Sequence, residues 1–394
     1  MVERFLQGVF MFVLRLERRF DPFVRPAFDA TLRDPIAACL QWAINLGRRD
    51  DGLRIAEEKP EPDEEAYLDS MIASIRTFMH AFWKPGSYER GGNTKTHGVV
   101  RAEFVVRDDL APELRHGLFA EPKTYRAWVR FSGPGPNWPK DIDDVGFVSM
   151  GIKVMGVPGP KLLADEKLTQ DFTAVCTPTF VTPDTRANSQ LQGRIVTGTT
   201  FFYFFNFVTP HVLDGFMQSL WNKTQNNPLQ ARYYSTVPYL LGEGQAMQYS
   251  MKPRSAKQDR VPNVPFRPPD DYLRAAMART LAGEDVDFDF LVQLQTDAHR
   301  MPIENAAVKW PERLSPFVPV ATVRIAKQTF DSPEQLRFAR YLSYNPWHCL
   351  PEHRPLGNQN RARYRMYQAA AALRQTEDDT PHLEPTGDEV FSNT

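Results

Sequence analysis

The sequence predicts an α+β fold: an antiparallel β-barrel with an N-terminal helical arm before it and C-terminal helices after it. The first observation is a series of β-rich runs, HGVVRAEFVV, TYRAWVRFS, VSMGIKVMGV and DFTAVCTPTFV. Asp-Asp, Gly-Pro-Gly-Pro and Pro-Gly turns separate these runs, which favours antiparallel strands that curl into a barrel. The second observation is that the βα alternation of a Rossmann fold is absent. The third is a set of helical patterns that flank the β-rich region.

Composition narrows the class of protein. Apolar residues make up 42% of the 394 positions, charged residues make up 24%, and the formal net charge is −1. We expect a soluble globular protein with one large core and no nucleic-acid partner, because no excess positive charge is present. The sequence has no GxGxxG or GKS/T phosphate loop, which disfavours a nucleotide enzyme. Three separated cysteines fit a reducing cytoplasm rather than a disulfide framework: Cys39, Cys176 and Cys349.

Residues 1–87 are expected to form the helical arm. The apolar run FLQGVFMFVLRL is too short to span a bilayer, and the start of the chain lacks the features of a signal peptide. Residues 1–20 could lie in a membrane interface, with aromatic side chains buried and arginines at the headgroups. The simpler alternative is an arm that packs on its own domain or on a partner subunit. The charged stretch EEKPEPDEE then leads to a helix in AYLDSMIASIRTFMHAFW.

The segment FDSPEQLRFARYLSYNPW contains the main candidate site residues, Arg340 and Tyr344. Asp331 or Ser332 can cap a helix here, and Arg340 and Tyr344 would then lie four residues apart on one helical face. A tyrosine has a pKa of about 10, so a phenolate at neutral pH requires a nearby cation, a metal, or both. Arg340 could supply that cation. A plain amphipathic helix with a cation–aromatic contact is the alternative.

This Arg-x-x-Ser-Tyr spacing resembles the proximal motif of the haem catalases. The resemblance implies that Tyr344 is the axial iron ligand of haem b and that Arg340 stabilises it as phenolate. Upstream segments resemble the same family in the same order, across about residues 88 to 350, and are most similar to divergent bacterial catalase-like haem-binding proteins. These segments are Glu89 to Lys95, Arg130 to Ser132, Gly151 to Val154 and Asp171 to Phe180.

The resemblance assigns further site residues. Arg90 and Arg130 would hold the haem propionates, and Ser132 matches the serine that orients the distal histidine of catalases. Val175 and Phe180 would belong to the cofactor pocket, since they lie in the segment that resembles the strand with the distal asparagine. The implied partner is a peroxide or hydroperoxide, and the implied assembly is a homo-oligomer.

The distal chemistry departs from that of a catalase. Asn93 stands where the family has its distal histidine, and an amide can hydrogen-bond a peroxide but cannot shuttle its proton at neutral pH. Val175 stands at the position of the distal asparagine, with Cys176 beside it. His97 is the candidate replacement base, but four extended residues would place it about 13 Å from Asn93 unless a bulge intervenes. A structural role is therefore favoured for His97.

The C-terminal part follows the core at residues 88–350. We expect a helix at residues 351–375 and a disordered acidic tail at residues 376–394. His348, Cys349 and His353 lie close in sequence, but a fourth ligand is missing, so we interpret them as structural rather than as a metal site.

The leading functional hypothesis is a haem-dependent oxidoreductase that acts on peroxides, as a weak peroxidase or in processing organic or fatty-acid hydroperoxides. The catalytic candidates are Asn93, Ser132 and, less favoured, His97. An efficient catalase is disfavoured by the altered distal pocket. The main alternative is a non-enzymatic haem carrier or sensor on a disarmed catalase scaffold. A third reading is a structural protein without haem, in which Arg340 and Tyr344 only pack.

Overall fold

The computed structural model describes residues 2–135, 140–206 and 208–392. Its centre is a closed antiparallel barrel with the strand order β5-β4-β3-β2-β1-β9-β8-β7, in which β5 pairs with β7 and so closes the ring. The short strand β6 pairs with the start of β7, along the same edge as β5. The predicted α+β class and the antiparallel barrel are confirmed. The strands are β1 (Lys95–Val106), β2 (Thr124–Gly133), β3 (Ser149–Met155), β4 (Thr169–Val175), β5 (Tyr233–Tyr234), β6 (Tyr239–Leu240), β7 (Ala246–Pro253), β8 (Val286–Leu294) and β9 (Val318–Ile325).

Side chains fill the barrel, because alternate residues of every strand point inward. Phe104, Phe172 and Phe290 are almost completely buried at its centre, and the Phe172 and Phe290 rings meet edge-on with 4.9 Å between their centroids. Tyr249 stacks on Phe290 at 5.3 Å. The barrel is therefore a packed core, and any site must lie on its outer face or at its ends.

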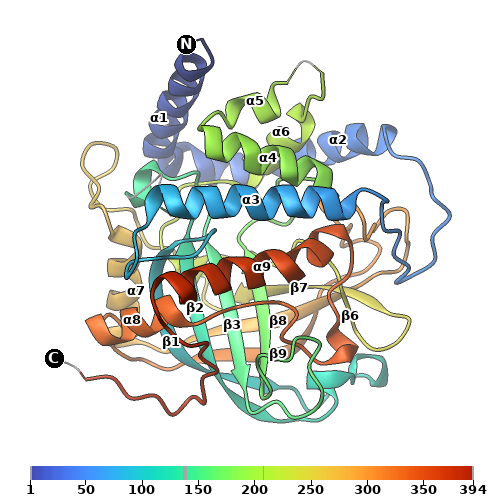
Figure 1. Cartoon of the computed structure of the whole chain (residues 1–394), viewed down its shortest axis with the longest axis vertical. Helices are drawn as coiled ribbons and strands as arrows, with labels where there is room; N and C mark the ends of the chain where they lie inside the picture. The colour runs from blue at the N-terminus through green and yellow to red at the C-terminus, as the bar shows by residue number, and fades with distance from the viewer. Residues whose placement is uncertain (1, 136–139, 207, 393–394) are drawn as a thin grey trace.

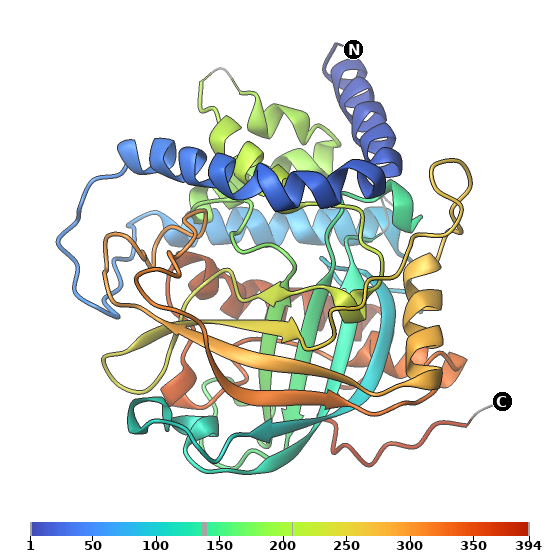
Figure 2. The ribbon, with the colours of Figure 1, turned by 180° about the vertical axis from the view of Figure 1, so that it is seen from behind.

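Helices cover the outer face of β1 to β4. In Figure 1, α3 and α9 lie across the front of the barrel with α4, α5 and α6 above them, and Figure 2 shows α1 and α2 running across the same end from behind. The helices are α1 (Val2–Thr31), α2 (Arg33–Leu46), α3 (Glu64–Phe82), α4 (Thr185–Thr197), α5 (Phe201–Phe204), α6 (Val212–Trp221), α7 (Tyr272–Gly283), α8 (Pro333–Tyr341) and α9 (Asn358–Glu377).

The acidic tail makes defined contacts as far as residue 392, in contrast to the disorder expected from its composition. Glu389 accepts a hydrogen bond of 2.9 Å from the indole N–H of Trp128, and the ring of Phe391 packs against that indole. His382 bonds to Glu166 at 3.1 Å. Composition missed these contacts because the tail carries a few well-placed apolar and acidic groups that match the outer face of the barrel. The division of the chain into arm, core, C-terminal helix and tail stays a prediction.

Candidate functional site

The candidate site lies on the outer face of strands β2, β3 and β4. Along β2, Val129 and Phe131 enter the barrel core, whereas Arg130 and Ser132 point outward. The strand register sets the outward residues in three rows, because directly paired residues point to the same side of a sheet. These rows are Trp128–Lys153–Asp171, Arg130–Gly151–Thr173 and Ser132–Ser149–Val175.

Tyr344 lies over this face, in the segment that follows α8. Ser332 caps α8 by accepting a hydrogen bond from the Gln335 amide, as the sequence predicted. The tyrosine ring packs on Gly151, where an added Cβ would lie 3.0 Å from the ring and would force it to shift by a few tenths of an ångström. The Tyr344 hydroxyl donates to the Trp128 carbonyl at 3.5 Å, a long contact that holds it weakly.

The expectation that Arg340 and Tyr344 share a helical face is wrong. Helix α8 ends at Tyr341 and the next residue is extended, so Tyr344 leaves the helical register. Arg340 instead donates to the Tyr88 carbonyl at 3.0 Å and to Asp378 at 2.5 Å. It ties α8 to the start of the core and to the end of α9.

Two other cations lie against the Tyr344 ring. The guanidinium carbon of Arg90 is 5.9 Å from the ring centroid, and the ammonium nitrogen of Lys153 is 5.7 Å from it. Burial raises the pKa of Tyr344 above its ordinary value, and the nearby charges of Arg90 and Arg130 offset only part of this rise. The phenol is therefore neutral at neutral pH unless a stronger electron acceptor binds its oxygen.

Three arginines from separate parts of the chain gather beside Tyr344. Arg90 donates to the Ala339 carbonyl at 3.0 Å, Arg130 donates to Thr96 at 2.7 Å, and Arg374 of α9 donates to Ser343 at 3.1 Å. Among the described residues, none of the three forms an ion pair with a carboxylate. One nitrogen of Arg90 and one of Arg374 are buried without any hydrogen-bond partner.

The pKa values of these three arginines also reflect their burial without ion-paired carboxylates. Burial, followed by repulsion from Arg90, lowers the pKa of Arg374 to about 9 and that of Arg130 well below its ordinary value. The pKa of Arg90 is also lowered, again mainly by burial. Buried cations without counter-charges are unfavourable. The arrangement is therefore suited to an anionic ligand.

The other predicted residues fall into two groups. Asn93, Ser132 and Val175 lie with Arg130 on the outer face: the Asn93 carbonyl accepts from Arg130 at 2.9 Å, and the Ser132 hydroxyl bonds to Arg130 at 2.8 Å. Asn93 has a left-handed backbone with φ of 48°, which asparagine tolerates better than most residues. Phe180 packs against the barrel core, with the guanidinium of Arg363 5.5 Å above its ring.

His97 is directed away from this group. A bulge between Thr96 and Gly98 shifts the register of β1, and Thr96 points to Arg130 while the His97 ring lies beside Gly133 and Asp141. Burial lowers the pKa of His97 well below its ordinary value, so the imidazole is neutral. It lies on the opposite side of the strand from Arg130 and Ser132.

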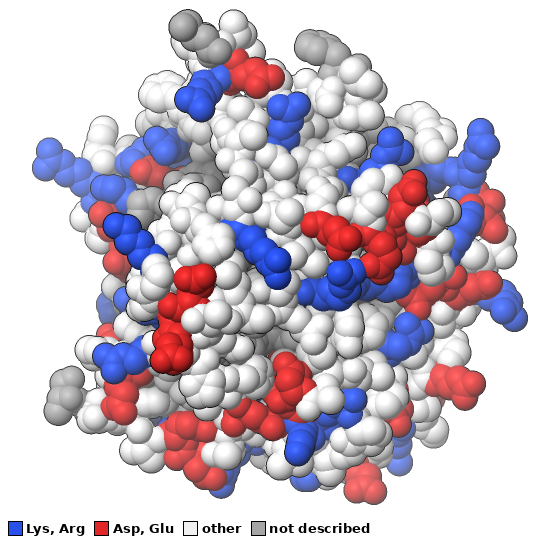
Figure 3. Space-filling view, viewed as in Figure 1, with Lys and Arg blue, Asp and Glu red and all other residues white. Residues whose placement is uncertain are grey.

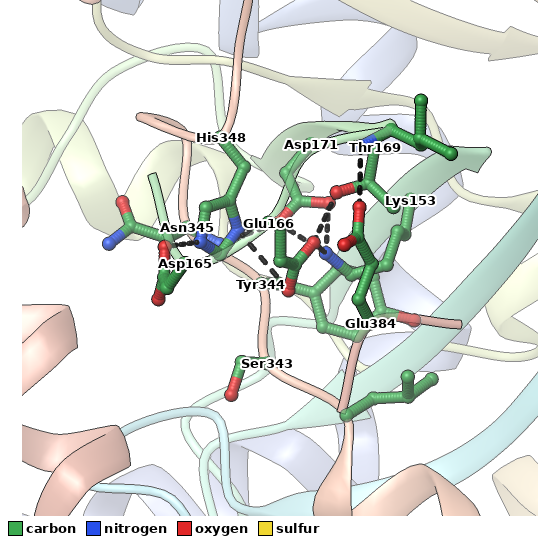
Figure 4. Close-up of polar contacts among 12 residues, drawn as sticks. Lys153, Asp165, Glu166, Thr169, Asp171, Ser343, Tyr344, Asn345, His348 and Glu384 are labelled. Carbon is green, nitrogen blue, oxygen red and sulfur yellow. Dashed lines mark hydrogen bonds and ion pairs between the residues drawn. The ribbon is translucent and has the colours of Figure 1, made fainter. Parts of the chain in front are cut away.

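A buried charge network supports the segment that carries Tyr344 (Figure 4). The ammonium group of Lys153 contacts Glu166 and, at 2.8 Å, Asp171. Asp171 also accepts the backbone N–H of Asn345 at 2.8 Å and a ring nitrogen of His348 at 2.8 Å. The network thus holds the residue that follows Tyr344 against strands β3 and β4.

Sequence reasoning missed this network and Arg374. Lys153 carried a usable signal, because a lysine inside the apolar run VSMGIKVMGV requires buried carboxylates. Arg374 offered none, since arginines are ordinary in an exposed alanine-rich helix. The neighbouring His348, Cys349 and His353 do not converge: His353 instead accepts a hydrogen bond from the Leu118 amide, and Cys349 is buried.

Comparison with solved structures identifies the fold. The chain aligns with a fungal catalase at a TM-score of 0.60 and 16% identity, over 88% of this chain and 70% of that one. Catalase A from Saccharomyces cerevisiae gives a TM-score of 0.57 and 14% identity, over 88% and 72%. A bacterial catalase gives 0.53 and 14%, over 83% and 63%. No protein-family model and no curated protein sequence matches the chain. The chain therefore has a catalase-like fold.

Proposed function

We propose that this protein is a haem-binding oxidoreductase that acts on peroxides, with haem b held against the outer face of β2 to β4. The observation that carries the proposal is the set of three arginines beside the weakly held hydroxyl of Tyr344, none of which forms an ion pair among the described residues, although one nitrogen of Arg90 and one of Arg374 are buried without a hydrogen bond. The donor set suits haem, because a phenol oxygen can bind ferric iron and guanidinium groups bind carboxylates. The catalase-like fold supports the same reading.

The roles of the residues follow from their positions. Tyr344 would hold the haem iron through its phenol oxygen, and the bound iron would lower the pKa that burial raises, so that the phenolic proton could pass to solvent. Arg130 and Arg374 would meet the propionates, and Val175 would line the same face. Arg90 replaces Arg340 in our proposal as the cation beside the phenolate, because Arg340 is bound to Asp378.

The residues of the proposed distal side, Asn93 and Ser132, can form hydrogen bonds to a peroxide but do not include a base for proton transfer. When bound, haem supplies the redox chemistry of peroxide cleavage. Asn93 would orient a hydroperoxide by hydrogen bonding, with Ser132 held in place by Arg130 and Ser149. His97 lies on the other side of β1, so we assign it no proton transfer. We therefore propose weak peroxidase activity or hydroperoxide processing rather than efficient hydrogen peroxide dismutation.

A carrier or sensor of haem is the second candidate. The observation that favours it is that His97, the one candidate base that we considered for the distal side, lies on the opposite side of β1 from Arg130 and Ser132. A homo-oligomeric state and a cytoplasmic location belong to the proposal as well, and the three unpaired cysteines support a reducing compartment.

Substitution of the proposed ligand tests haem binding. We expect the purified, haem-supplied protein to show a ferric tyrosinate spectrum, and Tyr344→Phe to reduce haem occupancy by roughly tenfold or more, because the axial bond is lost. Tyr341→Phe, which changes a neighbouring tyrosine that Arg340 contacts, is the matched control and should retain full occupancy. Equal occupancy in Tyr344→Phe and the parent would refute axial ligation.

Peroxide addition then separates the two candidates. A spectrum that changes with an organic hydroperoxide and recovers would indicate an enzyme, and His97→Ala should leave that rate unchanged. A bound haem that is inert to hydrogen peroxide and to organic and lipid hydroperoxides would indicate a carrier or sensor.

A further inference from the structure

Helix α1 is built with its polar side inward. Arg18, Asp21 and Arg25 are the buried residues of the helix, whereas most of its large aromatic and aliphatic side chains face the solvent. Phe10, which meets Phe201, and Phe28 are partly buried. Arg25 donates to the Asn222 carbonyl at 2.8 Å, and Asp21 accepts from the Thr224 amide at 2.6 Å. A surface helix of a soluble protein shows the reverse pattern. The polar contacts fix α1 to the body and leave its apolar side uncovered.

The uncovered apolar side chains are large and numerous. On α1 they are Val2, Phe5, Leu6, Val9, Phe12, Val13, Leu16, Phe20, Phe23 and Val24, with Phe5 68% and Phe12 66% exposed. Helix α2 adds Ile36, Trp42 and Leu46, with Trp42 63% exposed. The segment around α5 and α6 adds Phe205, Val208, Leu213 and Phe216.

These elements share one end of the molecule. Figures 1 and 2 show α1, α2, α5 and α6 together at the end that carries the N-terminus, and Figure 3 shows fewer charged side chains there than on the lower half of the same face. We define the apolar end as the exposed apolar residues of α1 and α2 together with Phe205, Val208, Leu213 and Phe216. Exposed apolar surface that extends over several elements marks an interaction site.

The charges around the apolar end indicate which partner would bind it. Residues 1–49 contain eight arginines against five acidic residues, and Arg4, Arg15 and Arg49 are exposed. The two exposed acids of α1 are already paired, Glu17 with Arg18 at 2.8 Å and Glu3 with Arg194 at 4.0 Å. Bulky apolar side chains bordered by arginines that form no ion pair among the described residues suit the boundary between acyl chains and anionic headgroups. Within the described residues, no helix combines the length and hydropathy required to cross a bilayer.

We propose that the apolar end is a membrane-docking surface, on which α1 and α2 lie in the plane of an anionic phospholipid bilayer with their exposed apolar residues below the headgroups. This extends the expectation for residues 1–20 to α2 and to Phe205, Val208, Leu213 and Phe216. It does not depend on haem binding, because none of its residues contacts Tyr344 or the three arginines beside it.

Vesicle flotation of the full chain tests the proposal. The vesicles contain either phosphatidylcholine alone or equal parts of phosphatidylcholine and phosphatidylglycerol. We expect association with the anionic vesicles that weakens at high salt, and a loss of roughly tenfold or more in Phe12→Gln/Phe23→Gln, since both side chains are exposed and their loss removes apolar area without disturbing the core. Leu168→Gln/Val390→Gln removes two exposed apolar side chains elsewhere and should float like the parent.

A label on Cys39 reports contact by α2 directly. Cys39 is exposed, whereas Cys176 is partly buried and Cys349 is buried, so a polarity-sensitive dye should attach at Cys39. It follows Ile36 and precedes Trp42 and Leu46 on one helical stripe. We expect its emission to shift to the blue with anionic vesicles. Absence of both flotation and dye shift would overturn the proposal. Self-association that Phe12→Gln/Phe23→Gln abolishes, without vesicle binding, would overturn it too and assign the surface to a second copy of the chain.

Discussion

Lys153 shows how much a single side chain contributes to the candidate site. It is fully buried on β3 and lies between Glu166 and Asp171, which are also buried. Burial alone would lower the pKa of Lys153, but the two carboxylates raise it above its ordinary value. Asp171 in turn accepts the Asn345 amide, so the lysine indirectly positions Tyr344.

Lys153→Met should therefore destabilise the protein by about 3–5 kcal/mol, because two carboxylates lose the cation that compensates their burial. Urea unfolding at neutral pH measures this change. Lys257→Met is the matched control: it breaks an exposed ion pair of 2.8 Å with Glu284 and should leave the free energy of unfolding nearly unchanged. Equal effects of the two substitutions would contradict the assigned role of the buried network.

At the scale of elements, the C-terminal tail behaves as part of the barrel wall. The Glu389 carboxylate accepts the Trp128 indole N–H at 2.9 Å and the backbone N–H groups of Thr386 and Gly387 at 2.7 and 3.0 Å. These bonds turn the chain back on itself, so that the Phe391 ring can cover Trp128. A flexible tail would leave that indole exposed.

Hydrogen exchange should detect this order. We expect the amides of Thr386 and Gly387 to be protected in the parent, and Glu389→Ala to speed their exchange by roughly tenfold, because their acceptor is removed. Asp388→Ala is the control, since the Asp388 side chain is exposed and, among the described residues, pairs with Arg126 rather than with Thr386 or Gly387. Exchange of the parent tail at the rate of an unstructured peptide would restore the disorder that the composition suggested.

At the scale of the whole molecule, the buried charges around His348 couple stability to pH. Burial would lower the pKa of His348, but hydrogen bonds to Asp165 and Asp171 raise it to about 9. The unfolded chain has an ordinary histidine pKa of about 6.5. The stabilisation by His348 is therefore complete below about pH 6.5 and is lost as the pH rises through about 9.

The expected size of this effect is about 3 kcal/mol between those limits. Urea unfolding at several pH values between about 6 and about 10 measures it, with a steady decline expected in the parent. His348→Gln should flatten that decline, while His299→Gln, in the loop after β8, should preserve it. A parent whose stability does not change over this range would show that His348 is not charged in the folded state.

The sequence by itself determined the fold class and the strands β1 to β4 that form one part of the barrel. Strand alternation and turn residues are local properties, so β2 to β4 and the cap of α8 follow directly from nearby residues. The same holds for the apolar character of residues 5–16. These predictions needed no knowledge of how distant segments pack.

Only the tertiary structure decided which charges meet. Arg340 and Tyr344 were expected to pair, yet α8 ends between them, and Arg340 binds Asp378 at the end of α9. Arg90 and Arg374 reach Tyr344 from segments far away in the sequence, and the bulge in β1 turns His97 to the other side of the strand. Such contacts depend on where a helix ends and on how barrel closure orients separate segments. Both result from packing over the whole chain, which no local pattern encodes.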